Sequence, residues 1–150
     1  MPVMEIRKAG DKVLKIMAMP VDKIDRKIKH LLDDMAETMY AADGVGLAAP
    51  QVGVSWRIVV IDVGEGIIEL INPEIVAKEG CEIGTEGCLS VPGMYGEVER
   101  YATVTVEALN RNGKKIRING SGLLARALQH EIDHLDGILF IELAKTMHKG

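Results

Sequence analysis

Residues 129–134, Gln-His-Glu-Ile-Asp-His, form the stretch that decides the fold and the chemistry of this 150-residue chain. Side chains four residues apart lie on the same face of a helix, so His130 and His134 can bind one metal ion. Glu131 follows the first histidine and can reach water bound to that metal. The metal acidifies the water and the carboxylate takes its proton, which describes a hydrolytic centre. The stretch therefore predicts a helix that carries a metal-dependent hydrolytic site.

The third metal ligand has to come from another part of the chain. One class of metalloproteases adds a glycine and then a third histidine after this motif; this chain has Gly137 but places Phe140 where that histidine should stand. Of the remaining histidines, His30 falls in a separate amphipathic segment and His148 lies two residues from the C-terminus. The best candidate is Cys88, in a Glu-Gly-Cys-Leu-Ser segment. Three protein ligands leave the fourth position of a metal open to water, as in catalytic sites.

Three segments, taken in order, resemble the signatures of the peptide deformylase family. They are Gly-Val-Gly-Leu-Ala-Ala-Pro-Gln at 44–51, Glu-Gly-Cys-Leu-Ser at 86–90 and the histidine stretch at 129–134. The similarity extends from near residue 22 to Phe140. Each segment alone is weak evidence, whereas all three in this order and at similar separations are strong evidence.

The resemblance implies both a fold and a reaction. The fold is α+β, with antiparallel β-strands packed around a metal-binding helix and an N-terminal amphipathic helix; the order of elements read from the sequence gives the same class. The reaction is the metal-dependent hydrolysis that removes the formyl group from the N-terminal formyl-methionine of newly made proteins and releases formate. The expected partners are N-formyl-methionyl peptides of nascent proteins, and contact with the ribosome is left open.

The resemblance also assigns roles to single residues. The expected metal ligands are Cys88, His130 and His134. Glu131 is expected to act as general base and then as general acid. The side-chain amide of Gln51 and the backbone N–H of Leu89 are expected to stabilise the oxyanion, because such donors do so without adding charge.

The methionine side chain of such a substrate needs an apolar slot. The candidates for substrate binding are Val45, Gly46, Glu86, Leu123 and Ala127. Arg126 lies close to the same helix face, at a position where the family usually carries an apolar residue. This departure bears on the shape of the pocket and on its side-chain preference.

The donor set bears on the identity of the metal. A thiolate with two imidazoles accommodates several divalent metals. The resemblance favours one ferrous ion, with zinc, nickel or cobalt as substitutes.

The composition is that of one ordinary globular domain, residues 1–150. Hydrophobic residues make up 47% and charged residues 27%, with a net charge of −4. This charge balance does not favour direct binding of nucleic acid. Apolar runs are too short for a membrane span, and charges interrupt the N-terminus where a signal peptide needs an apolar core. We therefore expect a cytoplasmic, bacterial-type protein, with an organelle form as the alternative.

Two other functions stand as alternatives. A zinc endopeptidase would share the histidine helix, but its third histidine or downstream glutamate ligand is not evident and the Cys88 segment would have no purpose. A non-enzymatic, metal-stabilised binding module would leave Glu131 and Gln51 without a role. In such a structural site Cys81 would have to be the fourth ligand, and its spacing from Cys88 does not fit the usual short knuckle.

Helical spacing of apolar residues predicts a long helix over residues 23–41, followed by a stop at Asp43-Gly44. The apolar stripe consists of Ile24, Ile28, Leu31, Leu32, Met35 and Met39. Asp22 is the expected cap of this helix. The metal helix is expected to begin at Ser121 or Gly122.

Apolar, β-branched runs predict strands over residues 57–62, 67–71, 103–109 and 115–118. Asn72-Pro73 is expected to end the second of these strands, and residues 74–84 are expected to form a further strand pair that buries Cys81. Asn112-Gly113 predicts a tight hairpin turn. Residues 142–148 are expected to form a last short helix.

Overall fold

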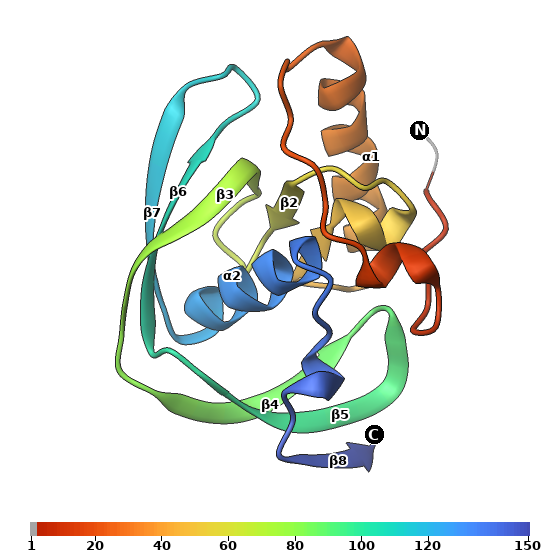
Figure 1. Ribbon diagram of the computed structural model, residues 1–150, viewed down its shortest axis with the longest axis vertical. Helices are drawn as coiled ribbons and strands as arrows, with labels where there is room; N and C mark the ends of the chain where they lie inside the picture. Colours follow the sequence, from red (N-terminus) through yellow and green to blue (C-terminus); the bar gives the residue numbers. More distant parts are fainter. Residues whose placement is uncertain (1–2) are drawn as a thin grey trace.

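A central helix carries the predicted histidines, and two antiparallel sheets lie around it (Figure 1). The computed structural model describes residues 3–150. The helices are α1 (Arg26–Ala41) and α2 (Gly122–Leu135), with short 3-10 helices η1 (Lys12–Lys15), η2 (Ala49–Val52) and η3 (Phe140–Glu142). The strands are β1 (Gly46–Ala48), β2 (Ile58–Ile61), β3 (Ile68–Glu79), β4 (Glu82–Cys88), β5 (Val91–Arg100), β6 (Thr103–Leu109), β7 (Lys115–Ser121) and β8 (Thr146–Lys149). The predicted α+β class is confirmed.

The larger sheet separates the two α-helices. Its strand order is β1-β2-β3-β6-β7, and the smaller sheet has the order β4-β5-β8. Strand β2 is buried along its whole length. Val59 and Ile61 pack in the core cluster that includes α2, whereas Ile58 and Val60 pack in the cluster that includes α1. Because successive side chains of a strand point to opposite faces, α1 and α2 cover opposite faces of this sheet.

Helix α1 is the predicted amphipathic helix, but it begins later than expected. The methionines of its stripe, Met35 and Met39, are fully buried, as a core stripe requires. The cap is Asp25, whose side chain accepts a hydrogen bond from the backbone N–H of Ile28. The prediction that Asp22 caps the helix is therefore wrong, because Asp25 is the residue that directly precedes the first helical turn.

The hairpin before the metal helix agrees with its prediction. Strands β6 and β7 pair in register from Thr103 opposite Ser121 to Leu109 opposite Lys115. Ser121 has extended backbone angles at the N-cap position, and α2 begins at the next residue. This hairpin therefore delivers the chain directly into α2.

Strand β3 does not end at Asn72-Pro73. The ladder between β3 and β6 shifts register between Ile71 and Glu74, so a bulge absorbs the proline, which has no N–H to pair. Asn72 has a positive φ of 54°. Its side chain exchanges two hydrogen bonds with the backbone of Val21, which hold this irregular point in place.

The predicted strand pair over residues 74–84 is wrong. Strand β3 pairs with β6 in the larger sheet, whereas β4 pairs with β5 in the smaller one. A turn at Gly80, with a φ of 73°, redirects the chain between the sheets. The prediction that Cys81 is buried is also wrong, because Cys81 lies exposed beside this turn and donates its S–H to Glu99 at 2.6 Å.

The predicted last helix over residues 142–148 is also wrong. A single 3-10 turn, η3, is followed by β8, which pairs with the free edge of β5 and sets His148 opposite Tyr95. A segment this short cannot form a stable helix by itself, whereas the strand edge supplies ready backbone partners.

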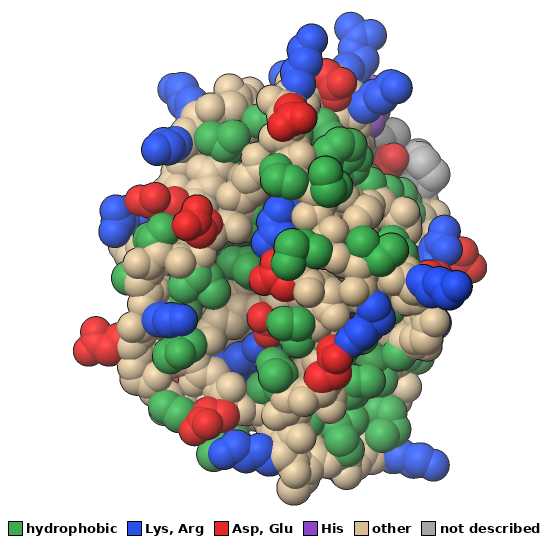
Figure 2. Space-filling view, viewed as in Figure 1, with side chains coloured by type: hydrophobic (Ala, Val, Ile, Leu, Met, Phe, Trp, Pro, Cys, Tyr) green, Lys and Arg blue, Asp and Glu red, His purple; other side chains and the backbone are tan. Residues whose placement is uncertain are grey.

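The surface of the described chain is mixed in character. Figure 2 shows acidic and basic side chains interspersed on the face viewed, with apolar side chains between them. Neither α-helix in the described residues is long and apolar enough to cross a membrane.

Candidate metal centre

Helix α2 holds its two histidines inside the molecule. His130 is 7% exposed and His134 is fully buried. The two rings stand edge to face, with their centroids 5.0 Å apart. Phe140, which follows the helix, stacks on His130 with the ring centroids 6.0 Å apart. Phe140 stands where such a protease has its third histidine, and here it packs against the imidazole of His130.

The hairpin between β4 and β5 brings Cys88 to these histidines. Cys88 pairs with Val91 across a two-residue turn, so the cysteine stands at the end of β4. Its Sγ lies 3.3 Å from Nε2 of His134. One donor atom from each of Cys88, His130 and His134 lies within 4.8 Å of the other two. Among residues 3–150, this is the group of His, Cys, Asp and Glu side chains that could hold a metal ion.

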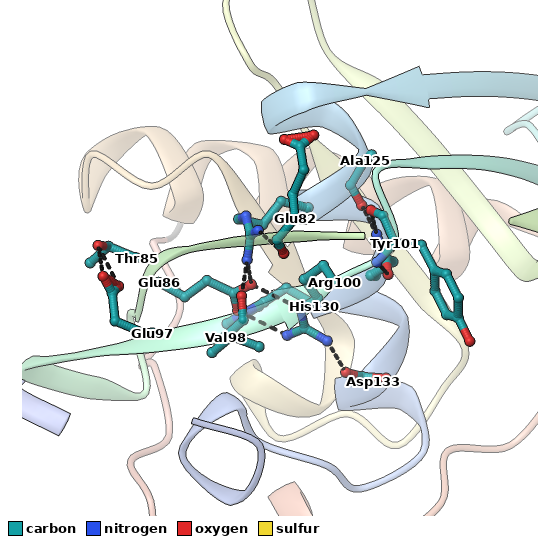
Figure 3. Close-up of polar contacts among 12 residues, drawn as sticks. Glu82, Thr85, Glu86, Glu97, Val98, Arg100, Tyr101, Ala125, His130 and Asp133 are labelled. Carbon is teal, nitrogen blue, oxygen red and sulfur yellow. Dashed lines mark hydrogen bonds and ion pairs between the residues drawn. The ribbon is translucent and has the colours of Figure 1, made fainter. Parts of the chain in front are cut away.

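Glu86 orients His130 from behind. Nδ1 of His130 lies 2.8 Å from Oε1 of Glu86, and Arg100 donates to both Glu86 oxygens at 2.8 Å (Figure 3). Burial opposes ionisation of Glu86, but the hydrogen bonds from Arg100 and His130 outweigh it and lower the pKa of the Glu86 carboxyl to about 2. Because the ionised carboxylate accepts, Nδ1 of His130 donates to Glu86, and Nε2 is the ring nitrogen that remains for a metal.

Arg100 extends this network to the next turn of the helix. Its Nη1 donates to Oδ2 of Asp133, so one guanidinium joins Glu86 of β4 to α2 (Figure 3). Arg100 is buried and fully engaged with these two carboxylates. Sequence reasoning missed Arg100 and the part played by Asp133. The motif contains Asp133, but no spacing rule connects Arg100 on β5 with Glu86.

Glu131 is buried against the backbone of β1. It is 4% exposed, and among residues 3–150 its Oε1 has no hydrogen-bond partner. A Cβ on Gly46 would lie 2.6 Å from Oε2 of Glu131, so only a glycine leaves room for this carboxyl group. Burial raises the pKa of Glu131 to about 7. A carboxyl group with such a pKa can both take and return a proton near neutral pH.

The amide of Gln51 faces the cysteine. Its Oε1 accepts a hydrogen bond from the backbone N–H of Ala48 at 2.9 Å. Its Nε2 therefore points the other way and donates to Oγ of Ser90 at 3.1 Å, with Sγ of Cys88 at 3.5 Å. The residue between them, Leu89, forms the hairpin turn and packs its side chain against Gly44.

A cavity of about 450 Å³ opens onto this group. The predicted site residues that line it are Val45, Gly46, Gln51, Glu86, Cys88, Leu89, Leu123, Ala127, His130 and Glu131. The remaining predicted residue, His134, lies behind the cavity wall in the metal-ligand group. The segments at 44–51, 86–90 and 129–134 are thus brought together from β1 and η2, β4 and α2.

The residues present fit a metal ion. A thiol and two imidazoles converge from separate elements, and Glu86 orients one of the imidazoles. Glu131, whose Oε1 has no hydrogen-bond partner among residues 3–150, lines the same cavity. This set is typical of a site with three protein ligands and one open position.

Comparison with known sequences places the chain in one family. The family model described as Polypeptide deformylase matches residues 3–150. The peptide deformylase of Acetivibrio thermocellus is 66% identical over 142 residues, which cover 95% of this chain and 84% of that protein. The peptide deformylase of Halothermothrix orenii is 63% identical over 144 residues, which cover 95% of this chain and 94% of that protein.

Solved structures agree with this assignment. The peptide deformylase of Thermotoga maritima superposes with a TM-score of 0.95 at 44% identity, covering 97% of this chain and 100% of that one. The peptide deformylase of Synechococcus elongatus, solved in complex with actinonin, gives a TM-score of 0.94 at 44% identity, covering 97% of this chain and 81% of that one. The chain therefore belongs to the peptide deformylase family, the metal-dependent hydrolases that remove the formyl group from the N-terminal formyl-methionine of newly made proteins.

Proposed function

We propose that residues 1–150 form a single catalytic domain whose deformylase site is the cavity at Cys88, His130 and His134. The observation that supports this is the convergence of a strand cysteine with two helix histidines within 4.8 Å. The group borders a cavity of about 450 Å³, and Glu131 also lines this cavity. A purely structural metal site needs neither an open cavity nor an adjacent base.

The three ligands would hold one divalent metal ion, for which we propose ferrous iron, with zinc, nickel or cobalt as substitutes. A donor set of one thiolate and two imidazoles accommodates all of these ions. When bound, the metal supplies a Lewis acid that makes water an effective nucleophile at neutral pH.

Glu131 moves the proton in this proposal. It takes a proton from the water that attacks the formyl carbon, and it returns that proton to the nitrogen when the carbon–nitrogen bond breaks. The products are formate and the free amine of the peptide. The raised pKa of Glu131, about 7, supports a group that exists in both protonation states during turnover.

Gln51 and Leu89 stabilise the charge that develops on the formyl oxygen. Nε2 of Gln51 is aimed toward Cys88 because Oε1 is held by the backbone N–H of Ala48. The backbone N–H of Leu89 follows Cys88 directly. Neutral donors fixed in advance stabilise an oxyanion without a cost of reorganisation.

The rest of the cavity receives the start of the peptide. Val45, Leu123 and Ala127 supply apolar surface for the methionine side chain, and Gly46 lines the cavity beside them while leaving room for Glu131. Glu86 also lines this cavity, but its two oxygens are already engaged by His130 and by arginines, so it shapes the wall and orients His130. The expected setting is the cytoplasm, where nascent formylated chains are made, without direct binding of nucleic acid.

Release of formate from a formyl-Met peptide tests the proposal. Metal-loaded protein should release formate and a free amine in equal amounts, and it should leave internal peptide bonds of an N-acetylated peptide intact. Cleavage at internal bonds would favour the endopeptidase alternative. Metal binding without either reaction would favour the binding module.

A further inference from the structure

Arg126 forms part of the cavity wall and is held rigidly there. It stands on α2 between the proposed pocket residues Leu123 and Ala127, and its side chain is only 15% exposed. Its Nη1 donates to Oε2 of Glu86 at 2.7 Å and to the carbonyl of Val98 at 2.9 Å. Its Nη2 donates to the carbonyl of Glu82 at 3.1 Å. These bonds fix the guanidinium group to β4 and β5 by its edge.

The flat face of the same guanidinium lies on Gly84. A Cβ built on Gly84 would lie 3.0 Å from Cζ, 3.0 Å from Nη2 and 3.1 Å from Nε of Arg126. Three atoms of the group are therefore almost equally distant from that point, which means that the plane faces the glycine. Gly84 does not have a positive φ, so the glycine serves the close approach of Arg126 and not an unusual backbone conformation.

The guanidinium group separates Gly84 from the cavity. Thr85 and Glu86, the next residues of β4, line the cavity together with Arg126, whereas Gly84 does not. The edge of the guanidinium group donates to acceptors on β4 and β5, and one of its faces covers Gly84. The other face is therefore the part of the group that can border the cavity. A guanidinium face is weakly hydrated and can contact an apolar or thioether side chain.

We propose that Arg126 is a specificity-determining residue, whose guanidinium group, supported by Gly84, sets the length of substrate side chain that the cavity accepts. This inference rests on the proposed function, because it takes the cavity as the slot for the first side chain of the formyl peptide. One fixed guanidinium group thus limits the length of that side chain. Removing the group lengthens the slot, and pushing it inward shortens the slot.

A series of formyl peptides with unbranched first side chains tests this limit. Matched peptides beginning with formyl-norvaline, formyl-norleucine and formyl-2-aminooctanoate are compared by kcat/KM at equal metal content. The parent protein should prefer norleucine to both neighbours. In Arg126→Ala, the ratio of 2-aminooctanoate to norleucine should rise roughly tenfold, because two further methylenes can leave water.

Gly84→Ala should act in the opposite direction. The new methyl group would displace the guanidinium toward the cavity, so the ratio of norleucine to norvaline should fall relative to the parent. In the double variant, Gly84→Ala with Arg126→Ala, the methyl group no longer meets a guanidinium, and the ratios should return toward those of Arg126→Ala. A general structural defect would lower kcat/KM for all three peptides together, and it would not shift the ratios of the two variants in opposite directions.

Arg117→Ala is the matched control, because Arg117 is an exposed arginine paired with Glu107 on the β6–β7 hairpin. It should leave every ratio unchanged. If Arg126→Ala does not fold, Arg126→Gln replaces it, since glutamine keeps a polar side chain but is shorter than arginine and should shift the ratios in the same direction. Unchanged ratios in folded, metal-loaded Arg126 variants would overturn the inference alone. Failure of the parent to release formate from formyl-norleucyl peptide would overturn the proposed function instead.

Discussion

The two cysteines of this chain occupy opposite environments. Cys88 lies 3.3 Å from His134 at the end of β4, whereas Cys81 is exposed and contacts Glu99. Cys88→Ala removes the soft ligand of the proposed site, so the metal content of the purified protein should fall sharply. Cys81→Ala is the control and should retain the parent metal content. Elemental analysis measures both, and parent-like metal affinity in Cys88→Ala would refute the assignment of this ligand.

Glu131 should be required for chemistry and not for metal binding. Glu131→Gln keeps the size of the side chain but removes the base, so turnover of formyl-Met peptide should fall by about 10²-fold or more. The metal content should stay near that of the parent, because the amide replaces a group outside the ligand set. Parent-like turnover by the fully loaded variant would contradict the proposed proton transfer.

Single residues of the site differ in how far sequence could find them. The sequence predicts His130, His134 and Glu131 as neighbours because helix geometry determines their relative positions within one short segment. The sequence identifies Cys88 only as a candidate ligand, since nothing in its segment indicates which helix it faces. Arg100 is not readable, because its contact with Glu86 depends on how β4 pairs with β5.

At the scale of the elements, the cap of α1 offers a measurable contrast. The side chain of Asp25 accepts a hydrogen bond from the N–H of Ile28 at 3.1 Å, whereas Asp22 stands outside the helix. Asp25→Ala should therefore lower the free energy of unfolding by about 1 kcal/mol. Asp22→Ala should change it by much less. Urea denaturation compares the two, and equal losses would show that the cap is not the origin of the effect.

Elements were predictable where one local pattern decides them. Alternation over residues 103–109 and the Asn112-Gly113 turn specify the hairpin, and both agree with β6 and β7. Partners outside the segment decide the rest. Strand β3 continues through a bulge at Asn72, whose side chain bonds to the distant Val21, and residues 146–149 become a strand because β5 has a free edge.

At the scale of the whole molecule, the proposed metal site joins parts that are distant in sequence. Cys88 comes from the smaller sheet, and the histidines come from α2, which packs on the larger sheet. Arg100 and Arg126 reinforce the same junction, since each connects Glu86 on β4 with α2 or β5. The two layers are therefore held together beside the cavity by these charged groups, and a metal bound to the three proposed ligands would add a further link.

Metal binding should accordingly stabilise the fold, because the unfolded chain does not hold the three ligands together. A ligand that binds only the folded state adds about 2.7 kcal/mol of stability when its free concentration is 100 times Kd. Removal of the metal by a chelator should lower Tm, and adding back a divalent metal should restore it. Glu131→Gln, which keeps all three ligands, should show the same metal-dependent rise in Tm, whereas Cys88→Ala should show little. A Tm that is identical with and without metal in the parent, with metal content verified, would mean that the three side chains do not act as a joint between the layers.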